Sequence, residues 1–161
     1  MLALRYAALL ALAVWVGGLI ALGGVVAPAL FDVLGATGNP GRLQAGAVFA
    51  DVLRRFHRIS YGCGAIVIVS LLARAILGPR PRRFALRASI AGLMLAASAW
   101  TGLVVAPQIA RTQSEIGGLA SSLPEDDARR IHFARLHRLT TTLALVPFVG
   151  GLVLLFWEIK D

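Results

Sequence analysis

The sequence predicts an all-α integral membrane protein: a four-helix bundle made of two parallel-repeat helical hairpins with pseudo-two-fold symmetry. Hydrophobic residues make up 58% of the 161 residues and charged residues only 15%. That charged fraction is lower than the surface of a soluble domain requires. Four apolar windows are each close to the roughly 20 residues that cross a hydrocarbon core, and a repeated motif relates them in pairs.

The four windows run approximately over residues 6–31, 59–77, 84–107 and 139–157. Because the bilayer core has no water to satisfy backbone groups, each window is expected to be a helix. The first window is longer than the apolar part of a signal peptide. We therefore expect one transmembrane domain over residues 1–161.

Two landmarks occur twice along the chain. The stretch GGVVAPAL at 23–30 is matched by GLVVAPQI at 102–109, and RRFHRIS at 54–60 is matched by ARLHRLT at 134–140. Pro28 precedes His57 by 29 residues, and Pro107 precedes His137 by 30. This spacing indicates an internal duplication, with repeat 1 over about residues 1–79 and repeat 2 over about 80–161. Since each repeat holds two spans, His57 and His137 are expected at the same membrane depth.

The formal charge of +8 comes almost entirely from arginines that flank the apolar windows. No aromatic-basic reader motif accompanies them, which excludes nucleic acid as a partner; arginines in such positions anchor helix ends among lipid headgroups. The short connection GPRPRRFALR at 78–87 is the most arginine-dense. The positive-inside rule then predicts cytoplasmic termini, and we expect a bacterial inner-membrane location.

The segment SSLPEDDARR at 121–130 predicts the start of the last helix. Ser122 is a candidate N-cap, Pro124 falls in the first turn, and the following acidic residues complement the helix dipole.

The histidine pair is the candidate site, and a b-type haem is the ligand that its surroundings favour. Helical spacing places Arg54, Tyr61 and Gly64 on the face of His57, and Arg130, Thr141 and Ala144 on the face of His137. Gly64 and Ala144 would let a neighbouring helix or a macrocycle approach the backbone. The adjacent Arg58 and Arg138, with Arg54 and Arg130, would hold the propionates.

Two alternatives remain open. Copper or another metal ion could bind His57 and His137, with His132, Asp32 and Asp51 on the same side of the membrane. A cofactor-free scaffold could instead pack through the glycine faces of the spans. No C-x-x-C-H motif is present, so covalent haem attachment is excluded.

The haem hypothesis predicts electron transfer, or an oxidoreductase acting on a small oxidant or quinone. The expected partners are the lipid bilayer, a quinone or redox protein, and further copies of the chain, since four short helices leave much apolar surface uncovered. The sequence identifies no catalytic residue.

The run FHRISYGCGA at 56–65, the WVGG at 15–18 and the late LHRLTTTLAL at 136–145 resemble the transmembrane-protein-205-like family. That family is a four-span membrane domain of unknown function. The resemblance covers most of the chain and supports the fold and the two histidines, but it implies no ligand. The W-x-G-G and R-F-H elements are also similar, more loosely, to copper-resistance membrane proteins, although the chain has only two methionines.

Overall fold

The computed structural model describes residues 2–78 and 82–160, and within those ranges it contains helices and loops but no strand. Four continuous helical runs cover Leu2–Gly35, Asn39–Leu77, Phe84–Ile116 and Ala128–Lys160. Each run is long and apolar enough to cross a membrane. The prediction of an all-α, four-span membrane bundle is therefore confirmed.

Two of the runs are divided by a π-helical turn. The first comprises α1 (Leu2–Ala21), the π turn η1 (Leu22–Val26) and α2 (Ala27–Gly35). The third comprises α4 (Phe84–Trp100), the π turn η2 (Thr101–Val105) and α5 (Ala106–Ile116). The other two are single helices, α3 (Asn39–Leu77) and α6 (Ala128–Lys160), and a short 3-10 helix, η3 (Ala120–Ser122), lies in the loop before α6.

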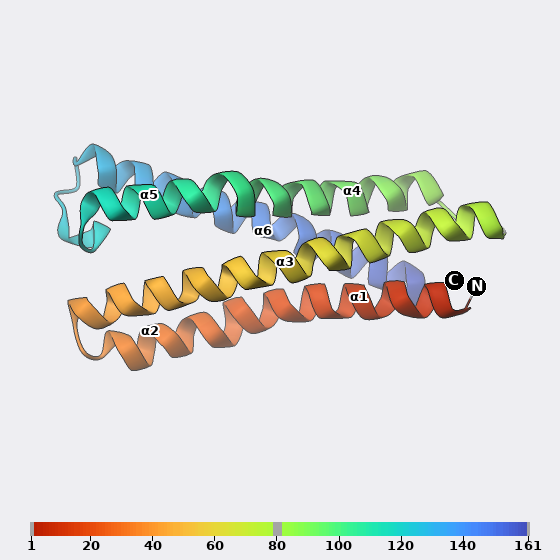
Figure 1. Ribbon diagram of the computed structural model, residues 1–161, viewed down its shortest axis with the longest axis horizontal. Coiled ribbons are helices and arrows are strands. Elements are labelled where there is room, and N and C mark those ends of the chain that lie inside the picture. Colours follow the sequence, from red (N-terminus) through yellow and green to blue (C-terminus); the bar gives the residue numbers. More distant parts are fainter. Residues whose placement is uncertain (1, 79–81, 161) are drawn as a thin grey trace.

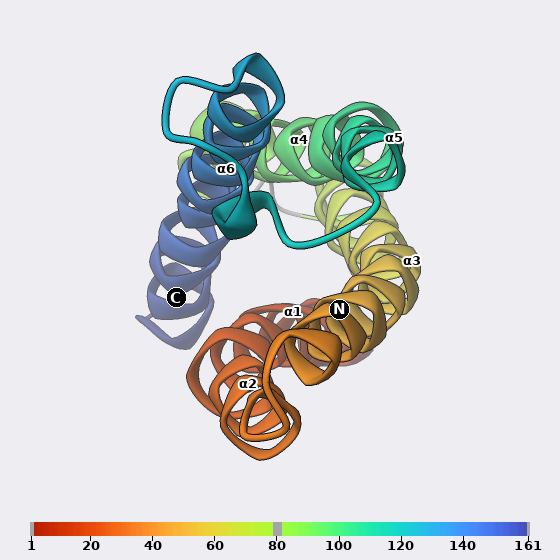
Figure 2. The same cartoon turned by 90° about the vertical axis from the view of Figure 1, so that its left-hand side faces the viewer.

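The helices form a ring in which α3 and α6 each pack between α1 and α4 (Figures 1 and 2). The start of α1, the end of α3, the start of α4 and the end of α6 lie at one end, here named the terminal end (Figure 1). The turn from α2 to α3 and the connection from α5 to α6 lie at the opposite end, the loop end (Figure 1). The first hairpin is thus α1, α2 and α3, and the second is α4, α5 and α6.

Both hairpins carry the π turn immediately before an Ala-Pro pair. The turn η1 precedes Pro28, and η2 precedes Pro107. Proline has no N–H for the carbonyl four residues earlier, and its ring clashes with that carbonyl. The helix therefore widens over the preceding turn. The same irregularity occurs at the two positions where the VVAP motif repeats.

The buried core is centred on Trp15 of α1 and Met94 of α4, both fully enclosed. Glycines allow neighbouring helices to approach these side chains: Gly64 of α3 lies against Trp15, and Gly150 of α6 lies against Met94. The outer surface carries many large apolar side chains, as a lipid-facing surface does, including Leu10, Ile66, Leu93, Leu103, Leu145 and Leu152.

The last helix begins later than the sequence predicts. Ser122 ends η3, and its hydroxyl donates a hydrogen bond to the Leu119 carbonyl at 2.6 Å, so the prediction that Ser122 caps this helix is wrong. The serine is engaged in a local turn that competes with capping. Asp127 is the N-cap, because its Oδ1 accepts a hydrogen bond from the Arg129 backbone N–H at 2.8 Å.

Candidate functional site

His57 lies on α3 and packs against η2 of the other hairpin. A Cβ placed on Gly102 would stand 3.0 Å from His57 Cγ and would overlap the Tyr61 hydroxyl. Only glycine at this position therefore lets the two rings lie so close to the η2 backbone. The Tyr61 hydroxyl donates a long hydrogen bond of 3.5 Å to the Ser98 carbonyl on α4, which adds a second link between the hairpins.

The Nε2 atom of His57 is buried and, within the described residues, has no hydrogen-bond partner. Its ring is stacked on that of Tyr61, with 6.2 Å between centroids and an interplanar angle of 20°. Buried polar atoms are nearly always paired, and an exception needs an explanation such as a ligand or an ordered water. This nitrogen is the most chemically distinctive atom of the predicted site.

His137 has different surroundings. Its side chain is exposed, and its ring lies nearly parallel to that of Phe133 on the same helix, 6.5 Å away. Gly23 of η1 corresponds to Gly102 in the repeated motif, but a Cβ on Gly23 would meet no atom within 4 Å. The second histidine is therefore not held against the opposite hairpin as His57 is.

The arginines expected to hold propionates divide into two groups. Arg54 pairs with Asp51, and Arg130 donates to the Leu123 carbonyl at 2.7 Å and to Glu125 at 3.3 Å. Arg58 and Arg138 are exposed. Only this second pair has guanidinium groups without hydrogen bonds to other described residues.

The small residues near the histidines do not open a shared cavity. A Cβ on Gly64 would stand 2.9 Å from Leu95 Cδ1 and 3.2 Å from the Trp15 ring. The space that Gly64 provides is thus filled by an indole of the protein itself. Ala144 is half-buried, and the Thr141 hydroxyl donates to the His137 carbonyl at 3.1 Å.

The described residues provide no ready set of ligands for a bare metal ion, the alternative to haem. Within residues 2–78 and 82–160 there is no group of three or more His, Cys, Asp and Glu side chains able to hold a metal. Asp51, expected as a contributor, is instead engaged by Arg54 and Arg55.

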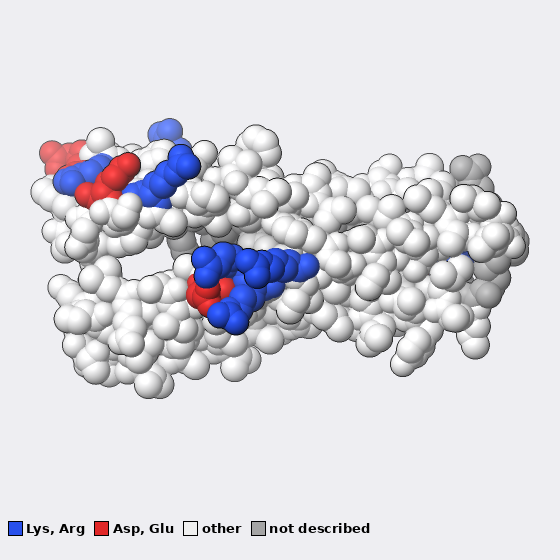
Figure 3. Space-filling view, viewed as in Figure 1, with Lys and Arg blue, Asp and Glu red and all other residues white. Residues whose placement is uncertain are grey.

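The two hairpins separate toward the loop end. There, α2 packs on α3 and α5 packs on α6, and the space-filling view shows an opening between the two pairs (Figure 3). The charged side chains visible on this face gather over the same half of the molecule (Figure 3). His57 contacts η2, the π turn that precedes α5 in the second hairpin.

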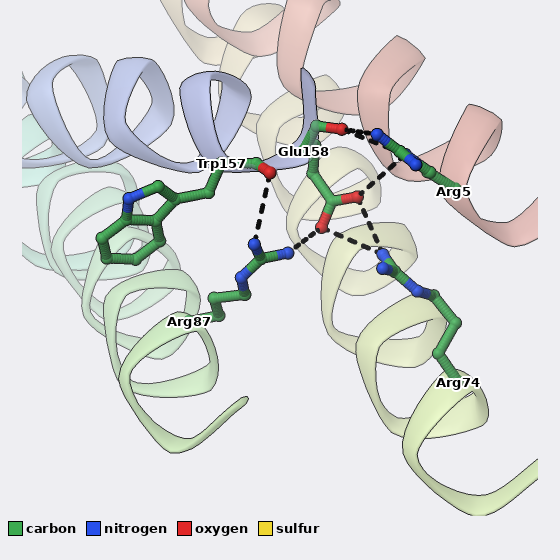
Figure 4. Close-up of polar contacts among 5 residues, drawn as sticks. All are labelled: Arg5, Arg74, Arg87, Trp157 and Glu158. Atoms are coloured by element: carbon green, nitrogen blue, oxygen red, sulfur yellow. Dashed lines mark hydrogen bonds and ion pairs between the residues drawn. The ribbon is translucent and has the colours of Figure 1, made fainter. Parts of the chain in front are cut away.

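A second polar cluster, which the sequence analysis missed, lies at the terminal end. The Glu158 carboxylate on α6 accepts hydrogen bonds from Arg74 of α3 at 2.8 and 2.9 Å and from Arg87 of α4 at 2.7 Å (Figure 4). Arg5 of α1 donates from Nε to the Glu158 carbonyl at 3.0 Å (Figure 4). One acidic residue thus connects to a basic residue on each of the other three spans.

This cluster also completes the end of α6. The last carbonyls of a helix lack partners within the helix and carry the negative end of its dipole. Arg5 bonds the carbonyl of Glu158, and Arg87 bonds that of Trp157 at 3.3 Å. The sequence signal for this cluster was one carboxylate and three arginines placed inside or beside apolar windows, where ionisable residues are costly and normally paired.

Comparison with known proteins gives one family. Residues 10–117 match the family described as a domain of unknown function (DUF4149). No curated protein and no solved structure matches the chain.

Proposed function

Since the chain belongs to the DUF4149 family, a domain of unknown function, we propose a function from the site itself: it binds b-type haem through His57 and serves electron transfer in the membrane. The observation that carries this proposal is the buried Nε2 of His57, which has no partner among the described residues. Family membership alone does not distinguish this function from others.

The unpaired nitrogen is costly unless something binds it. Leaving a buried acceptor or donor without a hydrogen bond costs about 1–3 kcal/mol, and a neutral imidazole always has one nitrogen with a free lone pair. Coordination to a haem iron would use that lone pair. Gly102 and Tyr61 restrict the ring on two sides, so this imidazole is positioned before any ligand arrives.

The neighbouring residues fit haem in part. Arg58 and Arg138 are exposed cations beside the two histidines and are available to carboxylates. Gly64 does not leave space for a macrocycle, because the Trp15 ring fills that space. Haem, when bound, supplies one-electron chemistry, and the protein supplies the axial ligand and the surrounding dielectric. His137 is the second candidate ligand, and its exposure makes a separate test necessary.

The test is a visible spectrum of the purified protein titrated with haem. We expect a Soret band for the wild type, its loss in His57→Ala, and its retention in His132→Ala, a control on an exposed histidine of α6. His137→Ala decides whether a second imidazole from this chain contributes. Absence of a Soret band after haem addition, or an unchanged band in His57→Ala, overturns the proposal. Stoichiometric copper without porphyrin iron in elemental analysis would favour the metal-handling alternative.

We also propose that the terminal end faces the cytoplasm and that the protein self-associates. Arg82 and Arg83 precede α4 at the terminal end, and the positive-inside rule favours a cytoplasmic position for this end. The exposed apolar surface is consistent with self-association in the bilayer. On the F-H-x-I-S-x-G-C run we also propose a relationship to the transmembrane-protein-205-like family.

A further inference from the structure

A cavity of about 560 Å³ lies at the terminal end, between the start of α4 and the end of α6. Four cationic and two aromatic residues line it: Arg82, Arg83, Arg87, Phe156, Trp157 and Lys160. No acidic side chain lines it within the described part of the chain. It is separate from the His57 site, since none of its lining residues belongs to α3 or η2.

The aromatic rings hold the cationic groups in place. The guanidinium carbons of Arg83 and Arg87 lie 5.6 and 5.8 Å from the centre of the Trp157 ring, and Lys160 Nζ lies 5.9 Å from that of Phe156. Cation–π contact restrains a guanidinium without using its N–H donors. The N–H donors of the Arg83 and Lys160 side chains therefore stay available for an anion in the cavity, whereas Arg87 is bound to Glu158 and to the Trp157 carbonyl.

Arg87 is a lining residue of the cavity whose side chain is held in a fixed position. Its side chain is 2% exposed and is bound to both Glu158 and the Trp157 carbonyl (Figure 4). Arg83 has a left-handed backbone, with φ 55° and ψ 36° at the N-cap of α4. A non-glycine residue rarely adopts this conformation, and such residues gather at ligand sites.

The terminal end carries an excess of positive charge. Its described cations are Arg5, Arg74, Arg82, Arg83, Arg87 and Lys160, and Glu158 pairs with the first, second and fifth of these. Across residues 2–78 and 82–160, Arg82, Arg83 and Lys160 form no salt bridge with a carboxylate. An anion from outside the chain is the natural partner for these three residues.

We propose that this cavity binds the phosphate of an anionic phospholipid headgroup. Guanidinium groups match phosphate oxygens in pairs of hydrogen bonds, and basic pockets between transmembrane helices accept anionic headgroups. The cavity lies at the end of the spans, where headgroups are found. Phe156 and Ile159, 61% and 74% exposed, provide apolar surface for the acyl chains, which a free phosphate ion would not use.

The test compares three probes on detergent-solubilised protein: dioctanoyl phosphatidylglycerol, dioctanoyl phosphatidylcholine and inorganic phosphate. Affinity is measured by native mass spectrometry and by the shift in Tm. The variant combines Arg82→Gln, Arg83→Gly and Lys160→Gln. The control removes the same charge from exposed arginines at or near the loop end, with Arg42→Gln, Arg111→Gln and Arg135→Gln.

We expect phosphatidylglycerol to bind at least about tenfold more tightly than phosphatidylcholine, because basic residues near the membrane surface attract anionic headgroups. That advantage should be lost in the cavity variant and kept in the control. Equal binding of the two lipids, or no change in the cavity variant, overturns the site. Inorganic phosphate binding as tightly as phosphatidylglycerol overturns the lipid assignment. Should the triple variant fail to fold, Arg83→Gly alone decides, because glycine tolerates the left-handed backbone and only the guanidinium is lost.

Discussion

Arg87 and Glu158 form a buried ion pair at the terminal end, with 2.7 Å between Arg87 Nη1 and Glu158 Oε1 and with 2% and 4% of their side chains exposed. The same carboxylate binds Arg74, and the Glu158 carbonyl binds Arg5. All four spans therefore meet at one residue. Charges removed from water in this way are stable only while each keeps its partners.

Glu158→Gln should lower the free energy of unfolding by about 3–5 kcal/mol, because it removes the negative charge that the desolvated Arg74 and Arg87 share. Thermal and chemical denaturation in detergent measures the change. Glu125→Gln is the matched control: Glu125 pairs with Arg130 at 3.3 Å, but 92% of its side chain is exposed. An exposed pair contributes at most about 1 kcal/mol.

A second measurement separates charge from packing at the Glu158 cluster. The triple variant Arg74→Met, Arg87→Met, Glu158→Leu should be less destabilised than Glu158→Gln, since an apolar replacement of all three charges removes their desolvation cost together with their attraction. If Glu158→Gln and Glu125→Gln prove equally stable, the cluster does not hold the spans together.

Gly102→Ala should disturb the His57 site, and Gly23→Ala should not. A methyl group at 102 would stand 3.0 Å from His57 Cγ and would overlap the Tyr61 hydroxyl, whereas at 23 it would meet no atom within 4 Å. The two glycines occupy matching positions in the two π turns. We expect the alanine at 102 to displace both rings and to reduce haem affinity in the spectral titration. Equal titrations for the two variants would contradict this prediction.

The spans could be predicted from the sequence because hydropathy is a local property, whereas the polar contacts between spans could not. Glu158 bonds to arginines from three separate helices, and no spacing rule relates those positions. At Gly64 the group that approaches the backbone is the Trp15 ring, from another helix, and no local pattern identifies that partner. At Ser122 the pattern was ambiguous, because a serine hydroxyl can bond a turn carbonyl as readily as cap a helix.

Gly64→Ala should destabilise the protein by about 1–3 kcal/mol, the usual cost of overpacking a core. Leu95 can shift, but the Trp15 ring, 3.2 Å from the added methyl group, is fully buried. Gly62→Ala is the control on the same helix, since its methyl group would meet nothing within 4 Å. Alanine in place of this exposed helical glycine should be neutral or stabilising by about 0.5–1 kcal/mol. Unfolding in detergent compares them, and a Gly64→Ala variant as stable as Gly62→Ala would show that the Trp15 contact is loose.

Asp127 should make the start of α6 sensitive to acid. Its hydrogen bonds to the Arg129 side chain and backbone lower the pKa of Asp127 from 3.8 to about 2. Because the folded-state pKa is depressed, the stabilisation is fully present above about pH 4 and is lost as the pH falls through about 2.

Asp127→Asn keeps a capping oxygen without the charge. The Tm difference between wild type and this variant should therefore shrink over that window. Asp126→Asn is the control, because the Asp126 side chain is exposed and forms no hydrogen bond with another described residue. Its Tm should follow that of the wild type throughout. A wild-type advantage over Asp127→Asn that stays constant down to about pH 2 would mean that the carboxylate charge does not stabilise this helix start.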